Sequence, residues 1–294
     1  MVQLISYLEI PVRLITIPVS HYCEKTRWAL TRLQIPFVEE RHMPPFHRFA
    51  TRRIGRQSDP VLVAETERRM SPINRFVSRR LGGQSVPVLV TETGVMTNSE
   101  EILRYVDAIA SDEAKLYPTE PENRQQVEEF VKLFDSVLAP AVRQWFYFYV
   151  FNQAQLVYPL WCQGVPWFER LLFPIVFRWM RSNVFQMYTI NAASATAAYE
   201  HICEIFKTIE SEIADGRAYL VGERFSAADL TFATLAAAVV MPSGYGVALP
   251  DLSKVPSQMA TNIQAFRETL AGKFVLRLYQ EHEDKARYLG CKTV

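Results

Sequence analysis

The sequence predicts an α/β domain followed by an all-α domain. Three observations carry the prediction. The N-terminal third alternates strand patterns with helical ones, a stretch rich in proline and acidic residues follows, and apolar residues beyond it recur at helical spacing. A chain of 294 residues also exceeds one ordinary domain. We therefore place the two domains at 1–110 and 126–294, joined by a linker at 111–125.

The elements of the first domain follow from short apolar runs and the turns between them. The expected order is a buried strand at 13–18, a helix at 22–33, a strand at 35–40, a hairpin of 86–90 and 95–96 about Gly94, and a helix from Asn98. This order, β-α-β and then α-β-β-α, is that of a thioredoxin-like domain.

The second domain carries two clear helix signals. Isoleucine and phenylalanine recur at helical spacing over 202–213, and Gly216 is expected to end that helix. Further on, Ser226 and Asp229 have the spacing of a capping box, with Phe225 placed to pack on Leu230. We expect a buried helix over 230–240.

An uncharged stretch at 144–168 is long enough to cross a bilayer. Its middle contains Asn152, Gln153 and Gln155, whose amides would lie unpaired near the hydrocarbon centre. We therefore expect two buried helices with a turn between them and no membrane span.

Composition limits the other classes. The net charge of +1 argues against a nucleic-acid partner, although residues 41–80 hold ten arginines, no lysine and three acids. That local charge either attracts anions or belongs to a solvated helix face. Four scattered cysteines match neither a disulfide framework nor a zinc site, so no metal is expected. The N-terminus lacks a secretory pattern, and we expect a cytoplasmic protein.

Residues 40–66 and 67–93 form a tandem repeat in which 17 of 27 aligned positions are identical. Each copy reads as a loop, a helix and a strand, and two copies are too few for a solenoid. We interpret the duplication as an insertion in the first domain and expect copy two, which runs directly into the Gly94 hairpin, to be the working one. Asp59 precedes Pro60 in copy one, where copy two has Val86 before Pro87.

Four motifs, SHYCEKTRWAL, SVPVLV, TNSEEILRYVD and FSAADLTFATL, occur in this order. Together they resemble the soluble glutathione S-transferases over both domains, outside the duplicated segment. The resemblance implies a thioredoxin-like domain followed by a helical domain, attack of glutathione on electrophiles, and a small apolar electrophile as the second substrate. It also implies a homodimer with a role in detoxification.

Ser20 stands where such enzymes carry their catalytic hydroxyl or thiol, at the start of the first helix. Its hydroxyl would donate to the glutathione sulfur, helped by the positive end of the helix. The alternative is that Ser20 only caps the helix. Tyr7 is a competing hydroxyl that precedes the first strand. Cys23 is a possible site residue, although a small buried thiol in the first turn is the plainer interpretation.

The resemblance assigns further glutathione contacts. Val86 before a cis Pro87 would offer its backbone to the cysteinyl part of glutathione. Asn98 and Ser99 would bind the γ-glutamyl group, although the family more often has Glu or Gln where Asn98 stands; a cap from Asn98 to Glu101 is compatible. The glycine carboxylate needs a partner among Gln84, Arg80 and Arg79.

The electrophile pocket is expected in the helical domain, where residues 145–151 are six aromatics and a valine. Tyr149 and Trp145 are candidates for lining this pocket, and the alternative for each is an ordinary place in the hydrophobic core. The sequence thus predicts a glutathione transferase that uses Ser20. Two alternatives stay open: a non-catalytic binding or scaffold protein of the same fold, and a glutathione-dependent oxidoreductase using the single thiol of Cys23.

Overall fold

A four-stranded sheet organises the N-terminal part of the computed structural model, which describes residues 11–54 and 85–288. The strand order is β2-β1-β3-β4. β1 (Val12–Thr16) pairs in parallel with β2 (Phe37–Arg41) and antiparallel with β3 (Val88–Thr91). β3 pairs antiparallel with β4 (Gly94–Met96) across the expected hairpin. The predicted thioredoxin-like order is confirmed.

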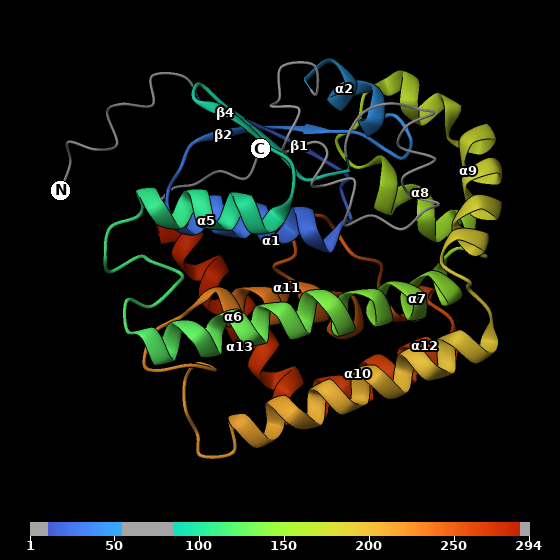
Figure 1. Cartoon of the computed structure of the whole chain (residues 1–294). Coiled ribbons are helices and arrows are strands. Elements are labelled where there is room, and N and C mark those ends of the chain that lie inside the picture. The colour runs from blue at the N-terminus through green and yellow to red at the C-terminus, as the bar shows by residue number, and fades with distance from the viewer. Residues whose placement is uncertain (1–10, 55–84, 289–294) are drawn as a thin grey trace.

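Helices cover both faces of this sheet (Figure 1). α1 (His21–Arg32) and α5 (Ser99–Ile109) lie side by side on the face turned towards the helical part. α2 (His47–Ile54) covers the other face, where Ile54 packs with Ile15 and Val88 in a small second core. Alternate side chains of β1 point to opposite faces, so Leu14 joins the large core while Ile15 joins the small one.

The rest of the described chain is helical. The remaining helices are α6 (Pro121–Leu133), the π-helical segment η2 (Phe134–Leu138), α7 (Ala139–Val150), α8 (Ala154–Cys162), α9 (Trp167–Met187), α10 (Ala192–Glu212), α11 (Ala227–Val240), the 3₁₀ segment η3 (Leu252–Lys254), α12 (Ser257–Glu268) and α13 (Leu270–Tyr288). α7 packs along α10, and α11 packs against α1, α6, α7, α12 and α13. One continuous hydrophobic core joins α1 to this bundle.

The capping box expected before α11 is present. The Ser226 side chain caps the helix. In the reciprocal bond, Asp229 Oδ2 accepts from the Ser226 N–H at 2.8 Å. Its Oδ1 accepts from the Leu220 N–H at 2.8 Å. Burial raises the pKa of Asp229 to about 6. The box therefore fixes the start of a helix that is buried along nearly its whole length.

Two differences from the prediction concern the linker and the uncharged stretch. Residues 121–125, expected in the linker, form the first turn of α6, because proline is favoured at the first helical position and an acid such as Glu122 suits the first turn. The uncharged stretch contains the end of α7 and then α8, as expected, but it runs on into α9 with Trp167 and Phe168 exposed.

Candidate active site

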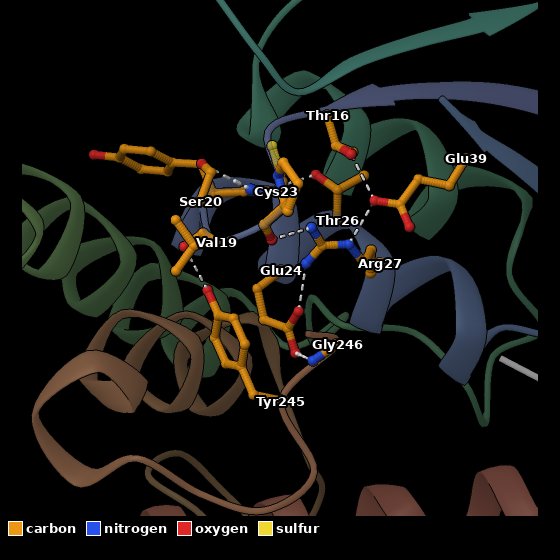
Figure 2. A network of polar contacts seen from close by, with 12 residues as sticks. Thr16, Val19, Ser20, Cys23, Glu24, Thr26, Arg27, Glu39, Tyr245 and Gly246 are labelled. Atoms are coloured by element: carbon orange, nitrogen blue, oxygen red, sulfur yellow. Dashed lines mark hydrogen bonds and ion pairs between the residues drawn. The ribbon is translucent and has the colours of Figure 1, made fainter. Parts of the chain in front are cut away.

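Ser20 ends the loop between β1 and α1 (Figure 2). Its extended backbone, φ −67° and ψ 122°, makes it the N-cap of α1. The Oγ accepts a hydrogen bond from the Cys23 N–H at 3.4 Å, which is long for such a bond. Capping uses an acceptor site of the hydroxyl and leaves its proton free to be donated elsewhere. The cap and the catalytic interpretation of Ser20 are therefore compatible.

A buried arginine braces the loop that carries Ser20. Arg27 donates to the Pro18 carbonyl at 2.6 Å and forms ion pairs with Glu24 at 2.6 Å and Glu39 at 2.7 Å. Burial alone would lower the pKa of Arg27, but Glu39 and Glu24 outweigh it and raise the pKa above the ordinary value. Arg27 thus stays charged and fixes the carbonyls just before Ser20.

The helical part holds the same loop from the other side. The Tyr245 hydroxyl donates to the Val19 carbonyl at 2.9 Å, and the Gly246 N–H donates to Glu24 Oε1 at 3.0 Å (Figure 2). A methyl group at Gly246 would come within 2.6 Å of Glu24 Oε2. The close approach of this loop to Glu24 therefore requires glycine. Sequence reasoning missed this network, because its members are scattered along the chain.

Cys23 lies behind Ser20 and is completely buried. Burial raises the pKa of its thiol to about 11, against a smaller lowering by Arg27. The thiolate is the reactive form of cysteine, so Cys23 is a poor nucleophile at neutral pH.

A cavity of about 690 Å³ opens beside Ser20. The sheet domain contributes Ser20, His21 and Val86 to its wall, and the helical part contributes Phe146, Trp161 and Leu249 among other apolar side chains. The peptide bond between Val86 and Pro87 is cis, as expected. The residues with the predicted hydroxyl and the predicted backbone edge therefore line one space, whose far wall is mostly apolar.

Two arginines give the cavity a positive character. Arg143 on α7 lies beside Tyr22 and Tyr188, with its guanidinium carbon 4.8 Å from the centre of the Tyr188 ring. Arg48 on α2 is the second, and its buried Nη1 has no hydrogen-bond partner among the described residues. No carboxylate occurs among the cavity-lining residues of the described chain. The charge of this space therefore favours an anion.

The two histidines of the wall and Tyr22 stay neutral near pH 7. Burial, with help from Arg143 and Lys25, lowers the pKa of His21 to about 3. Burial and Arg48 lower the pKa of His47 to about 3 as well. Burial raises the pKa of Tyr22 to about 12, so its hydroxyl keeps its proton. His21 Nε2 and His47 Nδ1 are buried without a hydrogen-bond partner among the described residues.

The γ-glutamyl candidates lie at the N-terminus of α5. Asn98 Oδ1 accepts from the Glu101 N–H at 2.8 Å, and Glu101 Oε2 accepts from the Thr97 N–H at 3.0 Å. In a capping box the Glu101 side chain would accept from the N–H of the N-cap residue, Asn98. Here it accepts from the N–H of Thr97, one residue earlier. Ser99 is buried. Neither Asn98 nor Ser99 belongs to the cavity wall, and Pro87 does not either.

The remaining candidates divide into two groups. Gln84, Arg80, Arg79 and Tyr7 lie outside the described residues, as does most of the arginine-rich segment. Trp145 is buried and Tyr149 packs against it, and neither lines the cavity. Phe146 and Tyr147 line it instead, one turn along from Arg143. The sequence did indicate this face. Phe146 and Tyr147 follow Arg143, the last charged residue before the uncharged stretch, by three and four residues, so all three share one side of the helix.

The structure also bears on metals and membranes. The described residues contain no group of three or more His, Cys, Asp or Glu side chains that could hold a metal ion. Within the same part of the chain, no helix is long and apolar enough to cross a membrane.

Comparisons with known proteins agree with the motifs. The family model of the glutathione S-transferase N-terminal domain matches residues 19–109, and that of the C-terminal domain matches residues 171–273. A glutathione S-transferase of Ceriporiopsis subvermispora in complex with glutathione is similar in fold, with 17% identity, TM-score 0.60, and coverage of 93% of this chain and 98% of that one. A glutathione transferase of Phanerochaete chrysosporium has 17% identity, TM-score 0.59, and coverage of 93% and 97%. A search of curated proteins finds no match. With its two domain models in the expected order, the chain belongs to the glutathione S-transferase family.

Proposed function

We propose that this protein conjugates glutathione to small apolar electrophiles, with the Ser20 hydroxyl stabilising the thiolate. One observation carries the proposal: Ser20 and Val86, which are 66 residues apart in the sequence, line one cavity whose far wall is mostly apolar. Members of the family use glutathione as a substrate, and a thiolate is the attacking species.

The roles follow from chemistry and position. The Ser20 hydroxyl donates a hydrogen bond to the glutathione sulfur, and the start of α1 adds its partial positive charge. Val86 offers its backbone to the cysteinyl part of glutathione, as an added strand would. Asn98 and Ser99, at the start of α5, bind the γ-glutamyl group, whose carboxylate suits a helix N-terminus.

The second substrate enters from the helical side. Phe146, Trp161 and Leu249 offer apolar contacts, so an apolar electrophile can lie within reach of the sulfur. The sulfur attacks the electrophilic carbon, a new carbon–sulfur bond forms, and the displaced group leaves with the electron pair. Arg143 and Arg48 favour the thiolate over the thiol through the field of the cavity.

Of the two alternatives, the oxidoreductase loses support from the burial and raised pKa of Cys23. A non-catalytic binding protein would use the same cleft, and only an assay separates it from an enzyme. Assembly as a homodimer, a cytoplasmic location and a role in detoxification are further parts of the proposal, and they rest on the family.

The test combines binding with turnover. We expect retention on immobilised glutathione, elution by free glutathione, and conjugation of an apolar aryl halide. Ser20→Ala should lower conjugation by about 10²-fold, by analogy with removing one oxyanion donor, and should leave folding intact. Ser85→Ala, at an exposed position of the same cavity wall, is the matched control. Retention without any conjugation by the unaltered protein would identify a binding protein instead.

A further inference from the structure

The outward side of α9 exposes a large apolar surface. α9 lies at the periphery of the molecule, beside α8 (Figure 1). Six large apolar side chains between positions 167 and 179 are exposed; they are Trp167 at 70%, Phe168 at 44%, Leu171 at 71%, Leu172 at 39%, Ile175 at 73% and Trp179 at 49%. We call these six residues the outer α9 face. Their spacing of three and four residues makes the surface continuous along the helix.

The residues of this surface are not the ones by which α9 packs into the core. The opposite side of α9 packs inward through Phe173, Phe177 and Val184. Single exposed apolar residues are common, but a contiguous patch of this kind marks an interaction site. α9 is therefore apolar on two sides; in the described chain the inner side is packed, while the outer side stays exposed apart from an edge contact of Phe168 with Phe46.

The exposed charged residues of α9 itself are all arginines. Arg170, Arg178 and Arg181 are exposed on α9. The one acid of this helix, Glu169, is buried and accepts from the Met43 N–H at 2.8 Å while pairing with His42 at 2.6 Å. α8 contains no charged residue. The patch thus combines large apolar side chains with exposed cations and carries no exposed acid of its own.

We propose that the outer α9 face docks onto an anionic lipid surface, with α9 lying in the interface plane. Leu171 and Ile175 would enter the acyl boundary, the rings of Trp167 and Trp179 would lie at headgroup level, and the arginines would meet anionic headgroups. A second copy of the chain fits less well, because a twofold contact centred on this helix would bring its arginines against their own copies.

The docked protein would hold its cavity close to the lipid. Trp179 belongs to the outer α9 face and also lines the cavity, together with Met180 and Val184 of the same helix. Apolar electrophiles concentrate in the lipid phase, so this position would shorten their path to the cavity. The docking itself does not depend on the proposed conjugation reaction.

Vesicle binding by the full chain tests the proposal, in buffer without glutathione. One set of vesicles is phosphatidylcholine alone, and the other also contains phosphatidylserine. We expect sedimentation with the phosphatidylserine vesicles, much weaker sedimentation with the neutral ones, and loss of binding as salt is raised. Tryptophan emission should shift to shorter wavelength on binding. Trp28, Trp145 and Trp161 are already buried, so the shift would report on the exposed pair.

Variants identify the surface. Leu171→Ser and Ile175→Ser should each weaken vesicle binding by about tenfold, since each removes most of one inserted side chain. Leu270→Ser, at a 53% exposed position on α13, is the matched control and should bind like the unaltered protein. Arg178→Gln should weaken binding to phosphatidylserine vesicles. Unchanged thermal unfolding midpoints verify that the variants fold.

Several results would overturn the proposal. They are no binding to phosphatidylserine vesicles, equal binding of Leu171→Ser and the unaltered protein, or equal binding to both kinds of vesicle. A dimer in analytical ultracentrifugation that Leu171→Ser converts to a monomer would make the face a contact between copies. Because glutathione is absent, failure here leaves the conjugation proposal standing, and failure of conjugation leaves this one standing.

Discussion

Among single residues, Ser20 depends on neighbours that are far away in the sequence. Arg27 fixes the carbonyl of Pro18, and Tyr245 fixes that of Val19. A hydroxyl must be held to within a fraction of an ångström to favour a thiolate. In the proposed mechanism, the Arg27 network would act by positioning Ser20, without contact with the substrate.

Gly246 is the residue of this network at which a single substitution tests the packing most directly. We expect Gly246→Ala to destabilise the protein by about 1–3 kcal/mol, the usual cost of overpacking, because the new methyl group would press on the buried Glu24 carboxylate. Urea unfolding measures the change. Gly94→Ala is the control, since no atom lies within 4 Å of a methyl group there. Equal stability of the two variants would show that Glu24 moves aside freely.

His47 makes stability depend on pH. Its pKa is about 3 in the folded state, below the ordinary 6.5, so the folded state resists protonation. The stability it contributes is present above pH 6.5 and is lost as the pH falls towards 3. At about pH 5 the loss amounts to at most about 2 kcal/mol.

The test replaces His47 with the residue at the equivalent position of the second copy. His47→Asn should lose less stability than the unaltered protein when urea unfolding is repeated at pH 7 and pH 5. Asp229, whose folded pKa is raised, titrates with the opposite sign, but it is common to both proteins and cancels in the comparison. His201→Asn, at an exposed site, should behave like the unaltered protein. An unchanged pH dependence of His47→Asn would mean that this imidazole is solvated.

Among the elements, each copy of the repeat contributes to the described sheet domain. Copy one contains the end of β2 and α2, and its His42 and Met43 bind the buried Glu169 of α9. Copy two contains β3, which pairs with the sheet. Copy one therefore supplies α2 and copy two supplies β3 to the described sheet domain. That copy two is the working one stays a prediction, because residues 55–84 lie outside the described residues. Asp59 and Pro60 lie outside the described residues.

This division changes which deletion should be tolerated. Removing residues 55–81 takes out one repeat length and joins Ile54 to Gly82, keeping both α2 and β3. We expect this variant to keep its fold and its glutathione affinity in calorimetry. Removing residues 40–66 instead puts Arg69 in place of His42. This deletion should weaken both the stability of the fold and the affinity for glutathione. The reverse order of affinities would show that α2 contributes nothing to the site.

Most elements could be predicted from local patterns. The apolar run of β1, the cap at Ser226 and the hairpin about Gly94 each depend on a few neighbouring residues, so the sequence alone indicated them. The first turn of α6 was missed because proline and glutamate are typical of linkers and also of helix starts. The outward face of α9 could not be predicted either, since its apolar residues surround the helix and do not show which side packs.

Across the whole molecule, the candidate site lies where the sheet domain meets the helical bundle. Ser20 and Val86 could be predicted as its members because each follows a local motif. Arg143 and Arg48 could not, because only the packing of α7 and α2 against the loop of Ser20 brings them to one cavity. A positive cavity with a hydroxyl at a helix start is suited to hold a thiolate.

The pKa of the thiol in bound glutathione tests this account most directly. Thiolate absorbance in the ultraviolet, followed over pH with saturating protein, gives that pKa for the unaltered chain and for Ser20→Ala. We predict a pKa well below the ordinary thiol value of about 8.5 in the unaltered protein, and a return towards that value in the variant. Equal thiol pKa values in the two complexes would contradict the role of Ser20.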